Sequence, residues 1–388
     1  MRKVVVFTST RADYGLLYWL MKDIEDTSTL QLEILASGTH LSPEFGLSYQ
    51  QIENDGFLIN EKVEMLLSTD TPVGVVKSMG VAALGFADAL DRMRPDVLVI
   101  LGDRFEALVA AQAAMIMNIP ILHIHGGEIT QGAYDDAIRH AITKMSNVHC
   151  VSAQEHYHRV VQLGEHPNTV FNVGALGLEH LNRTELLNTD ELSKSLGFKL
   201  TKPFFLVTYH PVTLSKTDSL KHFDCLLEAL DDYPKYQVII TFPNADNGAR
   251  QLIKKIMSYA TINSGRVFAL ASLGQLKYLS ALKLAAAVVG NSSSGIIEAP
   301  SFNTPTVNVG CRQKGRSCAQ SVIHTSTEKE DISNGISKAI KNVYGQKFYL
   351  NPYEKINTNQ KIIDVLVHTT FNQTKVFFDL HNKEYLNE

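Results

Sequence analysis

The chain has 388 residues, of which 45% are hydrophobic and 20% charged, and its formal net charge at pH 7 is -4. This is ordinary globular composition, and the length favours two domains over a single core. The net negative charge argues against general nucleic-acid binding, which requires a basic surface.

The cysteines and the apolar runs bear on the compartment. Cys150, Cys225, Cys311 and Cys318 are widely spaced and form no C-x-x-C pair, which is typical of free thiols in a reducing compartment. The apolar run near the N-terminus has only a strand's length, too short for a signal peptide, and no other run reaches the ~18 apolar residues of a membrane span. We expect a cytoplasmic protein without a membrane partner.

Taken in chain order, short β-branched runs alternate with helix-like stretches, which is the pattern of βαβ units. Strands are expected in the first half at residues 3–9, 32–37, 96–102, 120–126, 147–152 and 169–174. After a polar stretch at 181–202, further strands are expected at 203–209, 236–242, 266–270, 285–290 and 304–310. The pattern predicts an α/β fold with two Rossmann-like domains whose parallel sheets face a cleft.

Most of these strands end in small or polar residues. Thr10 and Arg11 follow the first strand, Asp103 and Arg104 follow the third, and Asn291 follows the strand at 285–290. In open α/β sheets, ligands bind beyond the carboxyl ends of the strands. One polar loop is ordinary, but so many together favour a ligand site.

Acidic residues follow two successive strands and open the next helix. Asp103 and Glu128 follow strands, whereas Asp135 and Asp136 begin a helical pattern in which one of them is expected to be a cap. Carboxylates that converge at one sheet edge repel one another, which raises the pKa of at least one. Such a group is suited to general acid–base catalysis near neutrality.

The histidines give weaker signals. His210 ends a strand, although a lone histidine is more often structural than catalytic. Alternation along the strand at 120–126 places His123 and His125 on one face, and His156 and His158 fall in a polar helical stretch where we expect them to be solvated. Because no spacing of Cys, His and carboxylate completes a zinc site, we expect no metal and no cofactor.

The segment GNSSSGIIEAP (290–300) follows an apolar strand and precedes a helical run. Its glycines permit close backbone approach, and its serines place hydroxyls beside helix N-terminal amides, as in a phosphate cradle. A serine N-cap is the ordinary alternative. The candidate ligand-binding residues of this segment are Ser292, Ser293, Ser294 and, for a ribose diol, Glu298. The P-loop and G-x-G-x-x-G patterns are both missing, which disfavours a P-loop NTPase and a standard dinucleotide site.

Four arginines follow strand ends and are suited to bidentate contacts with a diphosphate. They are Arg11, Arg104, Arg312 and Arg316. Any one of them alone would more often be a surface residue or half of a salt bridge. Their shared position at the carboxyl edge favours an anionic ligand.

Together these motifs resemble those of the hydrolysing UDP-N-acetylglucosamine 2-epimerases of bacterial sialic acid synthesis, and more distantly the epimerase half of the animal bifunctional enzyme and the non-hydrolysing epimerases. The resemblance extends to about residue 375 and rests on TSTRADYG, LGDRFEAL, HIHGGEITQGAYDDAIRHAITKMS, YHPVTL, FPNADNG, GNSSSGIIE and GCRQKGR. It implies the GT-B architecture, with a first domain at 1–178 joined by a C-terminal helix at 360–388 and a UDP-binding domain at 179–359. It also implies a homo-oligomer, a dimer or a tetramer.

The resemblance further implies roles for individual residues. UDP-binding roles fall on Arg11, His210, Asn244, Ser292, Ser293, Glu298 and Arg312. Catalytic roles fall on Asp103, Glu128, Asp135, Asp136 and His210. Some members carry a glutamate where this chain has His125, so His125 or Glu128 would supply that function here.

The implied reaction converts UDP-N-acetylglucosamine and water to N-acetylmannosamine and UDP, the first step of sialic acid synthesis. A carboxylate would remove the C2 proton as UDP leaves from C1, and hydration of the resulting 2-acetamidoglucal would complete the epimerisation. Three alternatives stay open. They are the same chemistry on UDP-2,4-diacetamido-2,4,6-trideoxyhexose in legionaminic acid synthesis, a GT-B glycosyltransferase, and a non-catalytic UDP-sugar-binding regulator.

Overall fold

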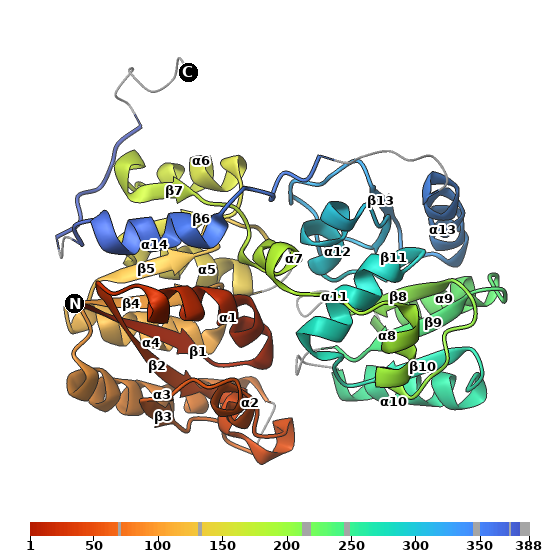
Figure 1. The fold of residues 1–388 in the computed structure, drawn as a ribbon, viewed down its shortest axis with the longest axis horizontal. Helices are drawn as coiled ribbons and strands as arrows, with labels where there is room; N and C mark the ends of the chain where they lie inside the picture. The colour runs from red at the N-terminus through yellow and green to blue at the C-terminus, as the bar shows by residue number, and fades with distance from the viewer. Residues whose placement is uncertain are drawn as a thin grey trace. The chain divides into compact units, whose positions relative to one another are not determined.

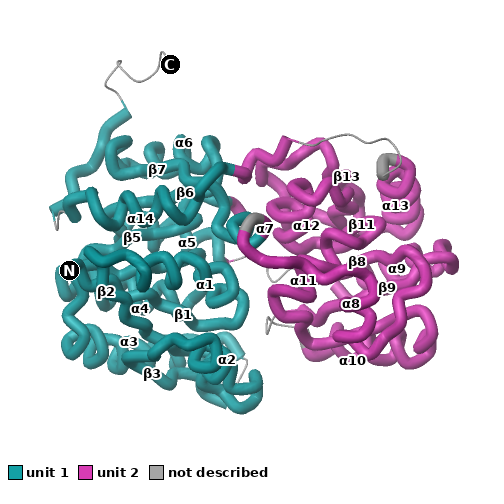
Figure 2. The backbone as a smooth tube through the Cα atoms, viewed as in Figure 1, with its two compact units in different colours: residues 1–128, 135–180, 355–388 teal, residues 129–134, 181–354 magenta. Residues whose placement is uncertain are grey.

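Two parallel sheets organise the chain (Figure 1), one in each of two units (Figure 2). The computed structural model describes residues 1–68, 71–130, 134–211, 219–243, 249–343, 350–371 and 374–380. Unit 1 comprises Met1–Glu128, Asp135–His180 and Lys355–Glu388, and unit 2 comprises Ile129–Tyr134 and Leu181–Glu354.

Unit 1 contains a 7-stranded sheet in the order β3-β2-β1-β4-β5-β6-β7, with parallel pairing between neighbours. Its strands are β1 (Arg2–Thr8), β2 (Leu30–Ser37), β3 (Glu61–Val63), β4 (Val97–Leu101), β5 (Ile121–Ile124), β6 (Val148–Val151) and β7 (Val170–Asn172). Its helices are α1 (Arg11–Asp26), α2 (Tyr49–Asn54), α3 (Pro72–Met93), α4 (Phe105–Ile116), α5 (Asp135–Met145), α6 (Gln154–Gln162) and α14 (Thr358–His368), and α7 (Glu179–Arg183) crosses the boundary between the units. The strand order reverses between β1 and β4, the position where such sheets bind ligands.

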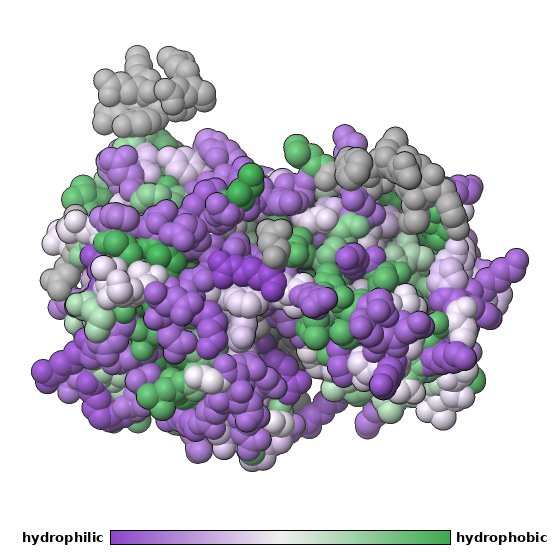
Figure 3. Space-filling view, viewed as in Figure 1, coloured by the Kyte–Doolittle hydropathy of each residue, from purple (hydrophilic) through white to green (hydrophobic). Residues whose placement is uncertain are grey.

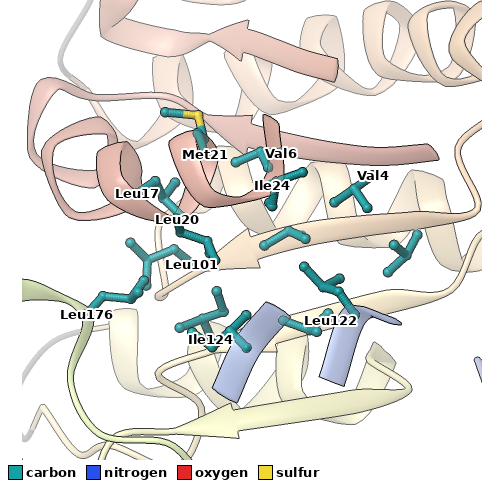
Figure 4. Packing of buried hydrophobic residues seen from close by; sticks show 14 of the residues in the cluster. Val4, Val6, Leu17, Leu20, Met21, Ile24, Leu101, Leu122, Ile124 and Leu176 are labelled. Atoms are coloured by element: carbon teal, nitrogen blue, oxygen red, sulfur yellow. The ribbon is translucent and has the colours of Figure 1, made fainter. Parts of the chain in front are cut away.

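Helix α1 shows how the sequence builds this core. Thr10 caps the helix and Asp13 completes a capping box with it, so the helix starts directly after β1. The buried side chains Leu17, Leu20 and Ile24 recur at helical spacing and belong to one hydrophobic cluster with Val6 of β1 (Figure 4). Burying each such side chain stabilises the fold by roughly 1.5–3 kcal/mol, which holds α1 against β1 and β2.

Unit 2 repeats the same topology with a 6-stranded parallel sheet in the order β10-β9-β8-β11-β12-β13. Its strands are β8 (Phe204–Thr208), β9 (Gln237–Thr241), β10 (Val267–Leu270), β11 (Ala287–Gly290), β12 (Thr306–Val309) and β13 (Val322–Thr325). Its helices are α8 (Thr189–Leu196), α9 (Ser219–Asp231), α10 (Ala249–Ile262), α11 (Gly274–Leu284), α12 (Ser294–Ile297) and α13 (Lys329–Val343). Here the order reverses between β8 and β11.

Every strand predicted from the sequence is present, and no end is shifted by more than two residues. The prediction misses β3 and β13, which lie at the sheet edges. Short edge strands are half-exposed, so their sequences lack the continuous apolar run that marks the buried strands.

The predicted helix at 360–388 is too long, because α14 ends at His368. Two β-branched residues, Thr369 and Thr370, follow it, and Thr369 already has extended backbone angles. The next described segment, 374–380, is not helical. It is held by Lys375, whose ammonium donates to the buried Glu165 carboxylate at 2.7 Å.

Helix α3 departs from the expectation that no stretch of the chain has the length and apolarity of a membrane span. Among the described residues, it alone is long and apolar enough by length and composition. Its buried residues Ser78, Ala82, Phe86 and Leu90 recur every four positions and pack into the core of unit 1. On the face drawn in Figure 3, hydrophilic side chains predominate, with hydrophobic ones in smaller groups.

Candidate functional site

The acidic residues of unit 1 lie around a single arginine. Arg139, in α5, pairs with Asp103 at the end of β4, and its Nη1 lies 3.8 Å from an oxygen of Asp136. The same Nη1 donates to the backbone carbonyl of Glu128 at 2.8 Å. The expected repulsion between the acids is therefore offset by a buried positive charge.

Arg139 is not among the site residues predicted from the sequence. Its pairing with Asp136 is nevertheless visible in the sequence, because the two residues are three positions apart and a helix brings such pairs to one side. Asp136 also lies 3.7 Å from His140, one turn further along. Asp135 occupies the first turn of α5, where an acid complements the helix dipole.

The prediction that His123 and His125 share a strand face is wrong. Strand β5 ends at Ile124, and His125 takes a left-handed backbone conformation with φ 64°. His123 is fully buried, and its ring nitrogens bond to the Gly102 carbonyl at 2.8 Å and the Thr143 hydroxyl at 3.1 Å. Burial lowers the pKa of His123 to about 3, so this histidine is neutral and structural.

His125 instead turns toward the acids. The Leu176 backbone N–H donates to its Nε2 at 3.2 Å, so the proton of the neutral ring is on Nδ1. That nitrogen lies 3.3 Å from Oε1 of Glu128. His125 and Glu128, the two candidates for one catalytic function, are thus in direct contact.

Glu128 is 4% exposed and accepts a hydrogen bond at 2.8 Å from the Ser152 hydroxyl. Ser152 in turn contacts Nδ1 of His156 at 2.9 Å. The prediction that His156 is solvated is wrong, because the loop of Gly127 covers the first turn of α6. His158 is exposed, as expected.

In unit 2 the ends of β8 and β11 are locked together. Gly290 has φ 140°, and a Cβ there would lie 2.0 Å from the Thr208 carbonyl oxygen, so only glycine fits. The next residue, Asn291, accepts from the His210 backbone N–H at 2.6 Å and donates to the His210 carbonyl at 2.8 Å. Asn291 is a positioning residue that the sequence analysis does not assign to the site.

His210 is buried beside Arg312. Burial and this neighbouring positive charge lower the pKa of His210 to about 3, so its imidazole is neutral at physiological pH. Arg312 is itself positioned by donating to the Asn291 carbonyl at 3.1 Å.

Tyr278, from α11, is a further residue near the serine segment that is not predicted from the sequence. Its phenol faces Ser292 and Ser294, and burial raises its pKa to about 12.

The serine segment forms a shorter helix than the phosphate-cradle prediction assumes. Helix α12 has only four residues, so its dipole is small. Ser293 is its N-cap residue but makes no side-chain capping bond, which leaves the ordinary capping role unfilled. Ser292 accepts from the Ser294 N–H at 3.4 Å, and Glu298 ends the helix.

The four arginines do not all have the same surroundings. Arg11 is exposed at the start of α1, whereas Arg104 pairs at 3.2 Å with the fully buried Glu106. Arg316 donates to the backbone carbonyl of Ile129 at 3.1 Å, so it positions the chain after Glu128. Asn244 lies outside the described residues. Within the described ranges, no group of three or more His, Cys, Asp or Glu side chains is arranged to hold a metal ion.

Comparison with known proteins gives a consistent result. A family model described as UDP-N-acetylglucosamine 2-epimerase matches residues 22–367. The chain is 42% identical over 337 residues to the GDP/UDP-N,N'-diacetylbacillosamine 2-epimerase (hydrolyzing) of Campylobacter jejuni, covering 87% of each protein. It is 36% identical over 388 residues to polysialic acid biosynthesis protein P7 of Escherichia coli, covering 99% of this chain and 96% of that protein.

Among solved structures, the UDP-GlcNAc 2-epimerase of Neisseria meningitidis bound to UDP-GlcNAc matches with a TM-score of 0.78 and 16% identity, over 95% of this chain and all of that one. At this identity the likeness bears on the fold alone. With the two parallel sheets, it confirms the predicted α/β fold of two Rossmann-like domains, as in GT-B proteins.

Proposed function

The chain belongs to the UDP-N-acetylglucosamine 2-epimerase family, and we propose from this premise that it is a hydrolysing epimerase of a UDP-activated 2-acetamido sugar. The observation that carries the proposal is the set of Asp103, His125 and Glu128 after the ends of β4 and β5, held together by Arg139 of α5. A glycosyltransferase need not abstract a C2 proton, and a non-catalytic binding protein has no use for such a set.

We infer that Glu128 is the base that removes the C2 proton while UDP leaves from C1. The Ser152 hydroxyl donates to its carboxylate and the His125 ring lies beside it, and both are neutral groups, whereas Asp103 is paired with the charge of Arg139. A carboxylate paired with a cation is the weaker base. Water then adds at C1, and a second group protonates C2 from the opposite face. Asp103, His125 and the Asp135–Asp136 pair are the candidates for that group.

The departing diphosphate requires positive and polar groups. We assign this role to Arg312 and the neutral His210, with Ser292, Ser293, Ser294 and Glu298 around them and Arg11, Arg104 and Asn244 as further contacts. Of these, Arg312 and His210 have the strongest support, because Asn291 fixes both at the β8–β11 switch point. A homo-oligomer is part of the same proposal.

Two sugars compete as the substrate. The 42% identity to the diacetylbacillosamine epimerase favours a 2,4-diacetamido-2,4,6-trideoxy sugar. The 36% identity to the polysialic acid protein extends over 99% of the chain and favours N-acetylglucosamine. The higher identity supports the diacetamido sugar and the greater coverage supports N-acetylglucosamine, so both substrates must be tested side by side.

The test is proton NMR of the protein with each UDP-sugar in D2O. Release of UDP with a C2-epimerised, C2-deuterated sugar from one substrate would establish both the substrate and the cleavage of the C2–H bond. Release of UDP with a non-deuterated sugar would mean simple hydrolysis and would overturn the elimination.

A further inference from the structure

A hydrogen-bonded chain reaches the Glu128 carboxylate from α6. Ser152, directly after β6, donates to Oε1 of Glu128 at 2.8 Å, and Nδ1 of His156 lies 2.9 Å from the Ser152 oxygen. Ser152 is 0% exposed and His156 1% exposed. Polar groups buried to this degree are costly unless they are hydrogen-bonded, so simple core packing would favour apolar side chains at both positions.

The direction of the chain follows from the number of protons. A carboxylate only accepts, so the single Ser152 proton points to Glu128. The contact with His156 must then be a donation from Nδ1–H to the serine oxygen, which fixes the histidine tautomer. Nδ1 of His125 lies 3.3 Å from the same Oε1, and the Leu176 N–H donates to the other nitrogen of that ring. Two histidines and a serine therefore orient one carboxylate.

The backbone next to Glu128 is also held against α6. Gly127 has φ +79°, and a Cβ there would lie 2.5 Å from the His156 carbonyl oxygen, so the loop contacts the first turn of α6. Arg159, one turn later in α6, donates to the Gly127 carbonyl. Since His156 and Arg159 are three positions apart, one side of α6 holds the loop.

We propose that Ser152 and His156 are positioning residues of the reaction, which hold the Glu128 carboxylate ionised and in one orientation. This assignment rests on the proposed function, in which Glu128 takes the C2 proton. Other charged or titratable groups near the Glu128 loop are His125 on the loop itself, Asp103 after β4, Asp136 and Arg139 on α5, and Arg159 on α6. The Ser152 hydroxyl donates directly to Glu128 and carries no charge, so its removal tests the hydrogen bond without changing the charge of the site.

The experiment compares Ser152→Ala, Ser152→Thr and Ser146→Ala on the substrate that the wild type consumes. Ser146 is the matched control, a fully buried serine directly after α5 whose hydroxyl donates to the Ile142 carbonyl in the last turn of that helix. Ser152→Ala should lower kcat by about 10- to 100-fold, the range expected for losing one hydrogen bond to a charged group. The acidic limb of the pH–rate profile should move up by about one pH unit, because the ionised form of the base loses a donor.

Ser152→Thr keeps the hydroxyl and should restore most of the rate and the original pH profile. His156→Phe should act in the same direction as Ser152→Ala but more weakly, since it leaves the Ser152 donor in place. Circular dichroism would check that each variant is folded. If Ser152→Ala matches Ser146→Ala in rate and pH profile, the positioning role is wrong although the epimerase proposal stands. If the wild type consumes neither UDP-sugar, the proposed function fails, and this role fails with it.

Discussion

Arg139 in α5 forms an ion pair with Asp103, which lies 36 residues earlier at the end of β4. The arginine side chain is 4% exposed and the aspartate 23% exposed. Because the same guanidinium also donates to the Glu128 carbonyl, one cation fixes two acids that the sheet places on neighbouring strands. The geometry of the acidic site therefore depends on a residue that carries no obvious catalytic motif.

Replacing Arg139 with glutamine should lower turnover by about 100-fold, because Asp103 and Asp136 lose the charge between them. The free energy of unfolding should fall by about 2 kcal/mol, less than for a fully buried pair because Asp103 retains contact with water. UDP binding should be unchanged, because the contacts with the strongest support, His210 and Arg312, lie in unit 2. Turnover assays, urea denaturation and calorimetric titration with UDP would measure the three quantities.

Arg92→Gln is the matched control. Arg92 also pairs with a carboxylate, Glu61, at 2.8 Å, but its side chain is 59% exposed. Exposed pairs contribute little, so activity and stability should both stay at the wild-type level. An Arg139→Gln protein that behaves like Arg92→Gln would show that the acids do not depend on Arg139.

The amide variants Asp103→Asn and Glu128→Gln test the acids directly. Each should reduce turnover by at least about 100-fold, because an amide can neither accept nor return a proton in this reaction. UDP affinity should be retained, since the proposed diphosphate contacts lie at His210 and Arg312. Loss of UDP affinity in either variant, measured by calorimetry, would contradict the acid–base roles and indicate nucleotide binding instead.

Local patterns are sufficient to predict the buried strands and the residues at their ends, because a buried parallel strand is a continuous apolar run that stops where the chain reaches water. Asp103 and His210 were found in this way. The same reasoning fails at His125, where alternation assumes that the strand continues. The backbone turns at φ 64° instead, and nothing in the residue itself signals that turn.

The burial of His156 and Arg139 cannot be predicted from the sequence for a related reason. Each lies in a polar helical stretch that reads as solvated, and each is buried by a loop from elsewhere in the chain, at Gly127 and at Glu128. Helical spacing shows which residues share a face, but which loop covers that face depends on tertiary contacts. Spacing from a known acid, such as Asp136 to Arg139, is the sequence signal that could have found one of them.

Gly290→Ala should abolish UDP binding. The new Cβ would lie 2.0 Å from the Thr208 carbonyl oxygen, so β8 and β11 would have to separate and Asn291 would no longer bracket His210. Gly80→Ala in α3 is the control, because a Cβ there meets nothing within 4 Å and alanine favours a helix by roughly 0.5–1 kcal/mol. If a soluble Gly290→Ala protein bound UDP normally in a calorimetric titration, the β8–β11 junction would not be the nucleotide site.

Buried histidines should make the protein less stable as the pH falls. The pKa of His123 is about 3 in the folded state, against 6.5 for the ordinary side chain, because burial disfavours its charged form. Between these values the unfolded chain binds the proton and the folded chain does not, so stability rises with pH. The stability that comes from keeping His123 neutral is fully present above pH 6.5, and it is lost progressively as the pH falls toward 3.

His123→Gln removes this proton uptake while keeping a donor for the Gly102 carbonyl and an acceptor for the Thr143 hydroxyl. Between pH 6 and pH 5, the free energy of unfolding of the wild type should fall by about 1 kcal/mol more than that of the variant. Urea denaturation at pH 7, 6 and 5 would measure the difference. Near pH 7 the contribution of His123 to stability hardly changes with pH. The plots of unfolding free energy against pH for wild type and variant should therefore diverge only below pH 7. Parallel curves would mean that His123 takes up a proton in the folded protein as readily as in the unfolded chain, which would contradict the lowering of its pKa by burial.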